Sequence, residues 1–316
     1  MKVFVLDAIN VKGVDVLRRQ AEAVLWDDPG VVRWREEADG IILRGNTPIT
    51  AADFAASVRL KAVSKQGTGV DKIDLAAARA HGVRVMNTPA LNAEAVAEMA
   101  MTLALCAARQ VPMLDRLLRS GAPVAREDFD GSRAGGAHGF WGKTVGIVGM
   151  GAIGQRTAAK WRGAFSTNVL WYDPYAPAGA LADIGGRVET LAALLPEVDL
   201  LSIHAPLTAE TRGLIGRKEL AMMKPTAILV SVARGGIVDE AALYEALASG
   251  ALFGAALDVF EREPPAADHP LFRIPAFVAT PHIGAGTIES REESSIAVVE
   301  QLLDVLNGGE GRNTLA

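Results

Sequence analysis

The sequence contains almost no cysteine. Cys106 is the only one among 316 residues, so the chain can form no internal disulfide bond and no cysteine-based metal cluster, and we expect no metal site. It stands in an apolar helical stretch, where a buried, unreactive thiol is expected. The sequence also lacks any block of lysine and arginine, and its formal net charge is -5. We therefore expect no nucleic-acid partner.

Long hydrophobic runs are absent as well. The most apolar stretch, residues 93–108, is interrupted by Glu94 and Glu98 and is too short to span a membrane. Residues 1–7 read as a short strand that ends in an acid, not as the apolar core of a signal peptide. Half of the residues are hydrophobic and 22% are charged, as in globular proteins. We expect a cytoplasmic protein with no membrane partner.

Short runs of β-branched residues alternate with helical patterns along the chain. We expect strands at residues 3–6, 40–43, 62–64 and 84–86, with helices at 11–21, 51–56 and 75–80 between them. A long helix is expected from Asn92, its N-cap, to about residue 118. Further strands are expected at 144–148, 168–172, 200–204, 227–230, 252–257 and 277–279, before a closing helix at 289–306. This alternation predicts an α/β fold with parallel sheets, and the length favours two domains.

Residues 119–141, between the two series, show no apolar period. A stretch of this length predicts a surface loop or arm that is functional, oligomeric or mobile. Its part from 126 to 140 is rich in glycine and arginine, which leaves the oligomer contacts open. We expect a homodimer or a dimer-based oligomer.

The strongest local motif is Gly149-Met150-Gly151-Ala152-Ile153-Gly154. It follows the expected strand 144–148 and opens a helical run, which is the setting of a dinucleotide-binding turn. Gly149 permits a tight turn, Gly151 lets the backbone approach a pyrophosphate, and Gly154 allows close helix packing. The helix N-terminus, at Ala152 and Ile153, offers amides and a positive dipole end to the anion.

Asp173 supports this interpretation. It ends the strand 168–172 and stands 19 residues after Gly154, where an acid binds the hydroxyls of the adenosine ribose. Tyr175 follows rather than arginine or lysine, so no cation is placed for a 2′-phosphate. The pattern therefore predicts NAD rather than NADP.

Three further motifs end strands of the second series. They are Ser231-Val232-Ala233-Arg234-Gly235-Gly236, Leu257-Asp258-Val259-Phe260-Glu261-Arg262-Glu263-Pro264 and Thr280-Pro281-His282-Ile283-Gly284. The carboxyl ends of parallel strands border the ligand crevice of an α/β sheet. The side chains that can converge there are Arg234, Asp258, Glu263 and His282.

With these motifs, and with Gly67-Thr68-Gly69-Val70-Asp71-Lys72-Ile73-Asp74 and His204-Ala205-Pro206-Leu207-Thr208, the sequence resembles the D-isomer-specific 2-hydroxyacid dehydrogenase family over nearly its whole length. The resemblance implies two Rossmann-like or flavodoxin-like parallel-sheet domains with a cleft between them. It implies a discontinuous outer, substrate-binding domain of residues 1–91 and 287–316, and an NAD-binding domain of residues 92–286. It also implies an oxidoreductase that transfers hydride between NAD(H) and a small 2-hydroxy or 2-oxo acid.

The resemblance implies that Arg234, Glu263 and His282 are catalytic. Histidine exchanges protons near neutral pH, and a carboxylate beside it favours its protonated form. Arg234 offers a planar fork of donors to the substrate carboxylate and carbonyl oxygen. His204 is expected to matter only through its backbone, and for Asp258 both a place near the nicotinamide amide and a purely structural role stay open. The expected cofactor contacts are Gly149, Gly151, Ala152, Ile153, Gly154, Asp173, Ala205, Pro206, Val232, Ala233, Arg234, Asp258, His282, Gly284 and Ala285.

A substrate site is expected from Arg234, His282 and the strand ends of the outer domain. The amides of Gly67, Thr68 and Gly69 can form a nest for a carboxylate. Arg44 can bind a second anionic group or, alternatively, cap the next helix. With the run Asn87-Thr88-Pro89, these residues resemble the 3-phosphoglycerate dehydrogenase branch. Hydroxypyruvate, glyoxylate and other 2-oxo acids stay open as substrates.

The sequence departs from the family pattern at Ser231, where asparagine is common, and no regulatory domain is expected after Asn313. Two other interpretations stay open. One is a non-catalytic, NAD-sensing corepressor of the C-terminal-binding-protein type, which would be expected to carry disordered tails. The other is a formate or phosphite dehydrogenase, which acts on a small anion without a 2-hydroxy acid.

Overall fold

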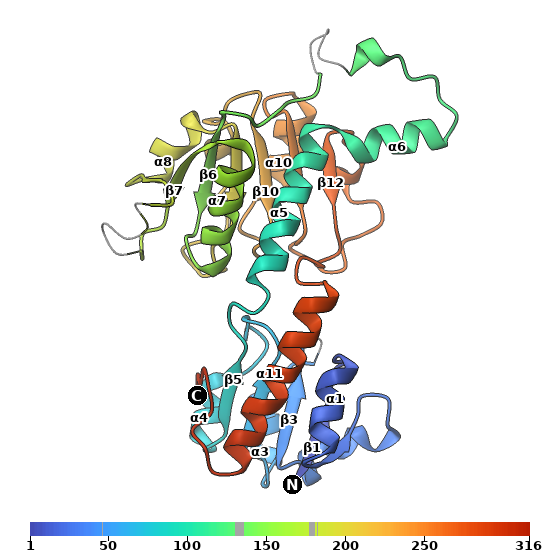
Figure 1. The fold of residues 1–316 in the computed structure, drawn as a ribbon, viewed down its shortest axis with the longest axis vertical. Helices are drawn as coiled ribbons and strands as arrows, with labels where there is room; N and C mark the ends of the chain where they lie inside the picture. Colours follow the sequence, from blue (N-terminus) through green and yellow to red (C-terminus); the bar gives the residue numbers. More distant parts are fainter. Residues whose placement is uncertain (46, 130–135, 177–180, 182) are drawn as a thin grey trace. The chain divides into compact units, whose positions relative to one another are not determined.

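The computed structural model describes residues 1–45, 47–129, 136–176, 181 and 183–316. The chain divides into two compact units, Met1–Asn92 with Ala285–Ala316, and Ala93–Gly284. The first unit is therefore discontinuous, and it carries both the blue and the red end of the chain in Figure 1. Its boundaries lie after residue 92 and before residue 285, where the sequence suggested 91 and 287.

The first unit is built on a five-stranded sheet in the order β2-β1-β3-β4-β5, with parallel pairing throughout. This is the strand order of flavodoxin-like folds. The strands are β1 (Lys2–Val5), β2 (Glu22–Val24), β3 (Gly40–Leu43), β4 (Ala62–Lys65) and β5 (Arg84–Asn87). The helices are α1 (Val11–Arg18), α2 (Trp34–Glu37), α3 (Ala51–Ala56), α4 (Leu75–Ala80) and α11 (Ile288–Leu306), with the 3-10 helix η1 (Pro29–Arg33).

Both faces of this sheet are covered, because successive side chains of a strand point to opposite faces. One face packs against α2, α3 and α4 in a cluster that includes Phe4, Ile41, Leu43, Val63, Trp34, Phe54 and Ala78. The other face packs against α1 and α11 in a cluster that includes Val3, Val5, Ile42, Val14, Leu17, Val298 and Leu302. The strands are therefore apolar on both sides, as parallel strands usually are.

The second unit is built on a seven-stranded sheet in the order β12-β11-β10-β9-β6-β7-β8, again with parallel pairing throughout. The strands are β6 (Thr144–Val148), β7 (Asn168–Tyr172), β8 (Gly186–Arg187), β9 (Leu200–Ile203), β10 (Ile228–Ser231), β11 (Gly254–Leu257) and β12 (Phe277–Ala279). The helices are α5 (Ala93–Ala108), α6 (Val111–Arg119), α7 (Ala152–Phe165), α8 (Leu191–Leu194), α9 (Arg217–Leu220) and α10 (Glu240–Ala248). The 3-10 helices are η2 (Arg126–Asp128), η3 (Leu195–Glu197) and η4 (Pro270–Arg273).

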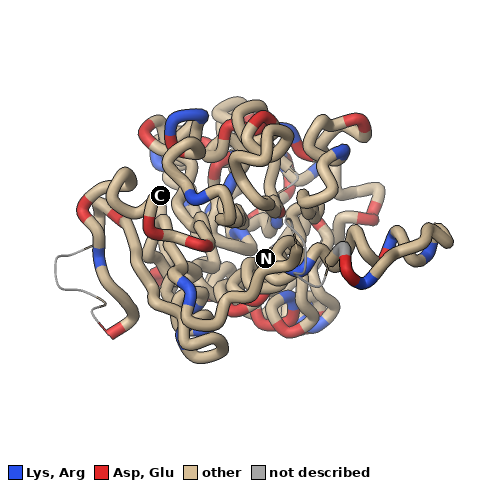
Figure 2. The backbone as a smooth tube through the Cα atoms, turned by 90° about the horizontal axis from the view of Figure 1, so that it is seen from above, with Lys and Arg blue, Asp and Glu red and all other residues tan. Residues whose placement is uncertain are grey.

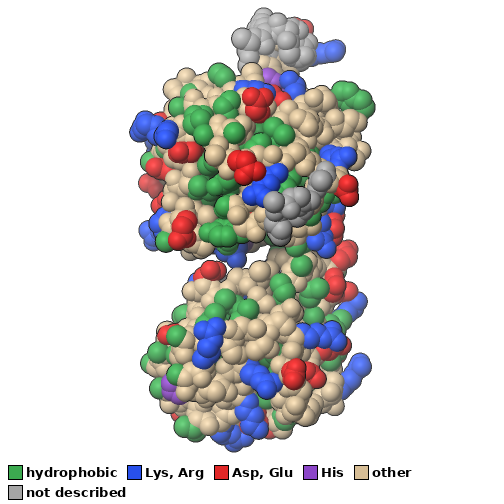
Figure 3. All heavy atoms as spheres, turned by 90° about the vertical axis from the view of Figure 1, so that its left-hand side faces the viewer, with side chains coloured by type: hydrophobic (Ala, Val, Ile, Leu, Met, Phe, Trp, Pro, Cys, Tyr) green, Lys and Arg blue, Asp and Glu red, His purple; other side chains and the backbone are tan. Residues whose placement is uncertain are grey.

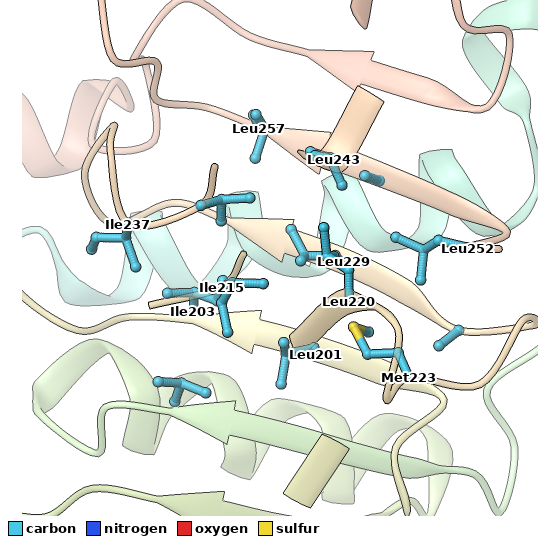
Figure 4. Packing of buried hydrophobic residues seen from close by; sticks show 14 of the residues in the cluster. Leu201, Ile203, Ile215, Leu220, Met223, Leu229, Ile237, Leu243, Leu252 and Leu257 are labelled. Atoms are coloured by element: carbon cyan, nitrogen blue, oxygen red, sulfur yellow. The ribbon is translucent and has the colours of Figure 1, made fainter. Parts of the chain in front are cut away.

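Helices cover both faces of the second sheet. On one side α5 packs against β10, β11 and β12, and α7 packs against β6 and β7. On the other side Leu201, Leu229 and Leu257 of neighbouring strands pack with Leu220 of α9 and Leu243 of α10 (Figure 4). The strand ends of this unit are thus anchored in a continuous core.

The long helix expected from the sequence is interrupted. α5 ends at Ala108 and α6 begins at Val111. Gln110, between them, has a φ of 52°, and Pro112 has no amide hydrogen with which to continue the α5 ladder. The helix begins directly after Asn92, as expected, but the buried Asn92 Oδ1 accepts no hydrogen bond from any described residue, so the side chain makes no capping bond.

Several short elements were not expected, among them β2, β8, α2, α8 and α9. They have two to four residues each, which is too few to show a period in the sequence. The nine-residue helix α10 was not predicted either. Within the expected arm, Arg119 closes α6 and residues 126–128 form η2, while residues 130–135 lie outside the described part of the chain. Cys106, expected to be buried, is only partly so, and burial raises the pKa of its thiol.

Charges of both signs are interspersed along the chain. Figure 2 shows acidic and basic residues alternating over the backbone, and the face in Figure 3 mixes them with hydrophobic side chains. Within the described ranges, no helix combines the length and the apolar composition that a membrane span requires.

Candidate active site

The candidate motifs of the second unit lie at one edge of its sheet. Its strands are all parallel, so they end on the same side. The residues that directly follow β6, β7, β9, β10, β11 and β12 are Gly149, Asp173, His204, Val232, Asp258 and Thr280. The chain order along the sheet reverses between β6 and β9, and α/β sheets bind their ligands at such a point.

The glycine turn has the shape that its motif predicts. Gly149 has a φ of 90°, and a Cβ there would lie 2.7 Å from the backbone nitrogen of Ala205. A Cβ on Gly154 would collide with the carbonyl oxygen of Gly149. Apart from its own chain neighbours, no described atom lies within 4 Å of the Cβ position of Gly151 at the start of α7. Packing therefore requires Gly149 and Gly154, whereas the open space at Gly151 fits a pyrophosphate at the helix N-terminus.

Asp173 joins the end of β7 to this turn. Its Oδ2 accepts the N–H of Met150 at 2.8 Å, and its Oδ1 accepts the N–H of Tyr175 at 2.9 Å. A carboxylate has about four lone-pair positions, so Asp173 keeps capacity for a ribose hydroxyl. Since Met150 belongs to the glycine turn, the same side chain also fixes the turn.

His204 directly follows β9, and its imidazole is neutral near pH 7. Burial lowers its pKa to about 3. Its Nε2 lies 2.9 Å from Ser202 Oγ, while its Nδ1 is buried without a hydrogen-bond partner among the described residues. The side chain therefore carries no positive charge at this strand end and cannot act as a general acid in place of His282.

His282 and Glu263 form a pair, with Nδ1 and Oε2 2.7 Å apart and side chains 47% and 37% exposed. Burial acts to raise the pKa of Glu263. The hydrogen bond from His282 and the charges of His282 and Arg234 outweigh it, so the pKa lies below its usual value. The Nε2 of His282 bonds to no described residue and stays available to a ligand.

Arg234 lies beside this pair. It follows β10, is half-buried, and donates from Nη1 to the carbonyl oxygen of Ala233 at 2.7 Å. Its charge acts on the carboxylate of Glu263. A Cβ on the next residue, Gly235, would collide with the carbonyl oxygen of Phe260. The segments that carry Arg234 and Glu263 are therefore in close contact.

Asp258 holds the segment that carries His282. Its side chain is 1% exposed; Oδ1 accepts from Thr280 Oγ1 at 2.6 Å and from Ile283 N–H at 2.9 Å, and Oδ2 accepts from Gly284 N–H at 2.8 Å. Its carbonyl oxygen accepts the N–H of His282 at 2.7 Å. These bonds keep His282 at a φ of 55°, which is unfavourable for a residue with a Cβ. The structural role left open for Asp258 is the one that its contacts support.

The remaining expected cofactor contacts fall in three places. Ala205 and Pro206 follow β9, and Val232 and Ala233 follow β10 at the same sheet edge. The amide of Gly284 is already bonded to Asp258. Ala285 begins the second segment of the first unit.

The expected substrate residues of the first unit also follow neighbouring strands. Arg44 follows β3 and Gly67 lies just after β4, and these two strands pair. The N–H of Gly67 donates to Thr88 Oγ1 at 2.7 Å, so this amide is engaged. The amides of Thr68 and Gly69 have no acceptor among the described residues. Two of the three expected amides can therefore meet an anion.

Arg291 was not expected at this place. It lies in the first turn of α11, three residues before Ser294, whose Oγ accepts from Gln66 Nε2 at 2.6 Å. Burial and the positive charge of Arg44 lower the pKa of Arg291. Neither guanidinium bonds to another residue in the part of the chain that the structure describes. In the sequence, Arg291 stands among glutamates and reads as one charge of a solvated helix face.

The NAD-binding-domain model of the D-isomer specific 2-hydroxyacid dehydrogenases matches residues 101–284. The chain belongs to this family. It is 40% identical over 309 residues to the D-3-phosphoglycerate dehydrogenase of Mycobacterium tuberculosis, covering 97% of this chain and 57% of that protein. It is 35% identical to the glyoxylate reductase of Korarchaeum cryptofilum, covering 97% and 93%. The crystal structure of a protein from Thermus thermophilus superposes with a TM-score of 0.90, at 37% identity and 100% coverage of both chains.

These matches confirm the family resemblance and the fold of two parallel-sheet α/β units. The family's NAD-binding domain coincides with the second unit, which contains the glycine turn and Asp173. The open space at Gly151 and the spare lone pairs of Asp173 fit a dinucleotide there. The chain spans 56 to 59% of the length of the curated 3-phosphoglycerate dehydrogenases that resemble it.

Replacing Asp258 by asparagine should loosen the segment that carries His282. One carboxylate oxygen becomes an amide nitrogen that accepts no hydrogen bond, and a buried donor left without an acceptor costs about 1–3 kcal/mol. We expect a lower Tm, and faster hydrogen exchange at the amides of Ile283 and Gly284. Asp268→Asn changes an exposed aspartate of the same connection and should alter neither. Unchanged exchange in Asp258→Asn would show that other contacts hold the segment.

Proposed function

We propose that the protein is an NAD-dependent D-2-hydroxyacid dehydrogenase that reversibly interconverts a small 2-hydroxy acid and its 2-oxo acid. The observation that carries the proposal is the His282–Glu263 pair beside Arg234, at the same sheet edge as the glycine turn. A proton donor, its carboxylate partner and a guanidinium for the substrate are what this reaction needs from the protein. The substrates proposed resemble 3-phosphoglycerate, hydroxypyruvate or glyoxylate.

In this mechanism bound NADH supplies a hydride to the carbonyl carbon. Protonated His282 donates its Nε2 proton to the carbonyl oxygen and becomes neutral, and in the oxidation neutral His282 takes the proton back. Glu263 orients the ring through Nδ1 and stabilises its protonated form. Arg234 holds the substrate carboxylate with parallel N–H donors.

The direct test is an assay of NADH consumption with a panel of 2-oxo acids that includes 3-phosphohydroxypyruvate, hydroxypyruvate and glyoxylate. Turnover of at least one of them is expected. NADH binding without turnover would favour the corepressor-like function. If formate or phosphite reduces NAD and no 2-oxo acid is turned over, the result would favour a formate or phosphite dehydrogenase.

His282→Ala should lower kcat by about 10²-fold or more, the usual scale for loss of a general acid. Glu263 and Arg234 remain, so substrate and NADH should still bind. Stopped-flow measurement of the hydride-transfer step and fluorescence titration with NADH check the two halves of this prediction. A variant with wild-type turnover would remove His282 from the mechanism.

Asp173→Ala should weaken NADH binding and narrow the difference between NADH and NADPH, because the ribose hydroxyls lose an acceptor. The variant also removes the bond to Met150 in the glycine turn. Asp173→Asn keeps an acceptor for that amide and separates the two effects. The measurement is kcat/KM with each cofactor, and a wild type that prefers NADPH would contradict the assignment.

Arg44 and Arg291 support a substrate with a second anionic group. Two guanidiniums that repel each other, without an anionic partner among the described residues, leave a site in which a phosphate or carboxylate would relieve the repulsion. The free amides of Thr68 and Gly69 follow the neighbouring strand. We therefore favour a 2-oxo acid whose far end carries an anionic group.

Arg44→Ala and Arg291→Ala should each raise KM for 3-phosphohydroxypyruvate by about 10-fold or more, since a charge-assisted bond contributes about 1.5–3 kcal/mol. KM for glyoxylate should change little, because glyoxylate has no distal group. Arg18→Ala, at an exposed position of the first unit, is the control. Equal losses on both substrates would mean that the two arginines serve the fold or the common carboxylate.

We also propose that the protein forms a homodimer. None of the nine residues of α6 is buried, and Val111 and Leu118 are 51% and 66% exposed. An exposed apolar helix face favours an interaction with a second copy. Analytical sedimentation of the wild type should give a dimer, and Leu118→Glu should weaken that dimer. A monomeric wild type at tens of micromolar would contradict the proposal.

The cytoplasmic location stays a prediction, which cell fractionation can check.

A further inference from the structure

Glu240 and His269 contact the segment that carries Glu263. Glu240 is the first residue of α10, and the two side chains are only 14% and 17% exposed. Glu240 Oε2 lies 2.9 Å from His269 Nε2, and Glu240 Oε1 accepts the N–H of Glu261 at 2.6 Å. One carboxylate therefore binds two points of the connection between β11 and β12.

His269 is held on its other side as well. Its Nδ1 is placed to accept the N–H of Leu271 at 3.4 Å, while its Nε2 faces Glu240. Its ring meets Phe260 edge-on, with centroids 5.7 Å apart, and lies 5.3 Å from the ring of Phe272. Both ring nitrogens and the ring faces thus fix its position.

The contacts continue from this pair to Glu263. His269 packs on the side chain of Phe260, and Glu240 binds the backbone of the next residue, Glu261. The N–H of Phe260 donates to Glu263 Oε1 at 3.2 Å, and Glu263 Oε2 bonds to His282. The backbone of Phe260 also contacts Gly235, next to Arg234.

We propose that Glu240 and His269 are positioning residues for the His282–Glu263 pair. Neither touches a reacting atom. They hold Phe260 and Glu261, and through the N–H of Phe260 they hold the carboxylate of Glu263 against the imidazole. The inference rests on the proposed function, in which His282 transfers the proton. Without this pair the segment can shift, and Glu263 bonds to His282 for a smaller fraction of the time.

Glu240→Ala removes both acceptors. In the proposed mechanism protonated His282 then has a weaker anionic partner, so the pH at which the reduction rate falls should become lower. Glu263→Gln, which removes the anionic partner itself, should shift the pH profile in the same direction. We expect kcat to fall roughly tenfold, less than the ~10²-fold loss of a general acid, with KM for NADH within about twofold. Glu240→Gln keeps an acceptor for Glu261 and should be intermediate, so it carries the test if Glu240→Ala does not fold. His269→Ala should move the profile in the same direction.

A double variant distinguishes positioning from general loss of stability. Glu240 and His269 are proposed to act through Glu263. When Glu263 is already replaced by glutamine, adding Glu240→Ala should therefore move the pH profile no further. Glu245→Ala is the matched control, because Glu245 lies on the same helix and pairs with Arg217 at the surface. It should leave kcat and the pH profile at wild-type values.

The proposal would be overturned if Glu240→Ala moved the pH profile as far in the Glu263→Gln background as it does in the wild type. A wild-type pH profile in both Glu240→Ala and His269→Ala would also overturn it. If the wild type reduces no 2-oxo acid, the proposed function fails, and the pair is then tested by NMR titration of the His282 ring. A midpoint that moves to lower pH in Glu240→Ala supports the positioning role. An unchanged midpoint rejects it.

Discussion

In the second unit, the carboxyl ends of seven parallel strands lie at one edge of the sheet, and the connections that follow them pack closely against one another. The crowding is visible at three glycines. A Cβ on Gly149 would meet Ala205, one on Gly235 would meet Phe260, and one on Gly284 would lie 2.9 Å from Asp258 Oδ2. Each contact joins two different strand ends. The segments that carry Arg234, Glu263 and His282 are therefore held by one another rather than by the core alone.

Asp258 and Glu263, which both lie in the connection between β11 and β12, have different roles at this edge. Asp258 is 1% exposed, and both of its carboxylate oxygens are bonded to the 280–284 segment. The side chain of Glu263 is 37% exposed, and its Oε2 lies 2.7 Å from Nδ1 of the His282 imidazole. A buried, saturated carboxylate resists any change in its partners. Asp258 therefore fixes the backbone of the segment that carries His282, and Glu263 bonds to the His282 ring itself.

Local sequence signals predicted the parts of the structure that depend on local contacts. The glycine motif and the acid 19 residues later were recognisable because both belong to a single β-α-β unit. The resemblance placed Glu263 and His282 in one site, although 19 residues separate them. The break at Gln110 was missed because the apolar period of α5 continues into α6.

Other features depended on tertiary contacts that no local pattern encodes. The saturation of Asp258 requires three donors from another connection, so the sequence left its role open. Arg291 meets Arg44 only after α11 has packed on the sheet that Arg44 follows. The edge strands β2 and β8 form because a neighbour offers a free side, and their own residues show no alternation.

The open space at Gly151 has a consequence for reading natural variation in this chain. A methyl group on Gly149 or Gly154 would strike the protein's own backbone, whereas one on Gly151 would meet no described atom. Selection for folding therefore acts on Gly149 and Gly154. At Gly151 the only selection is for ligand binding. A survey of variants scored by protein abundance would classify Gly151 as tolerant, and the same survey scored by dinucleotide binding would not.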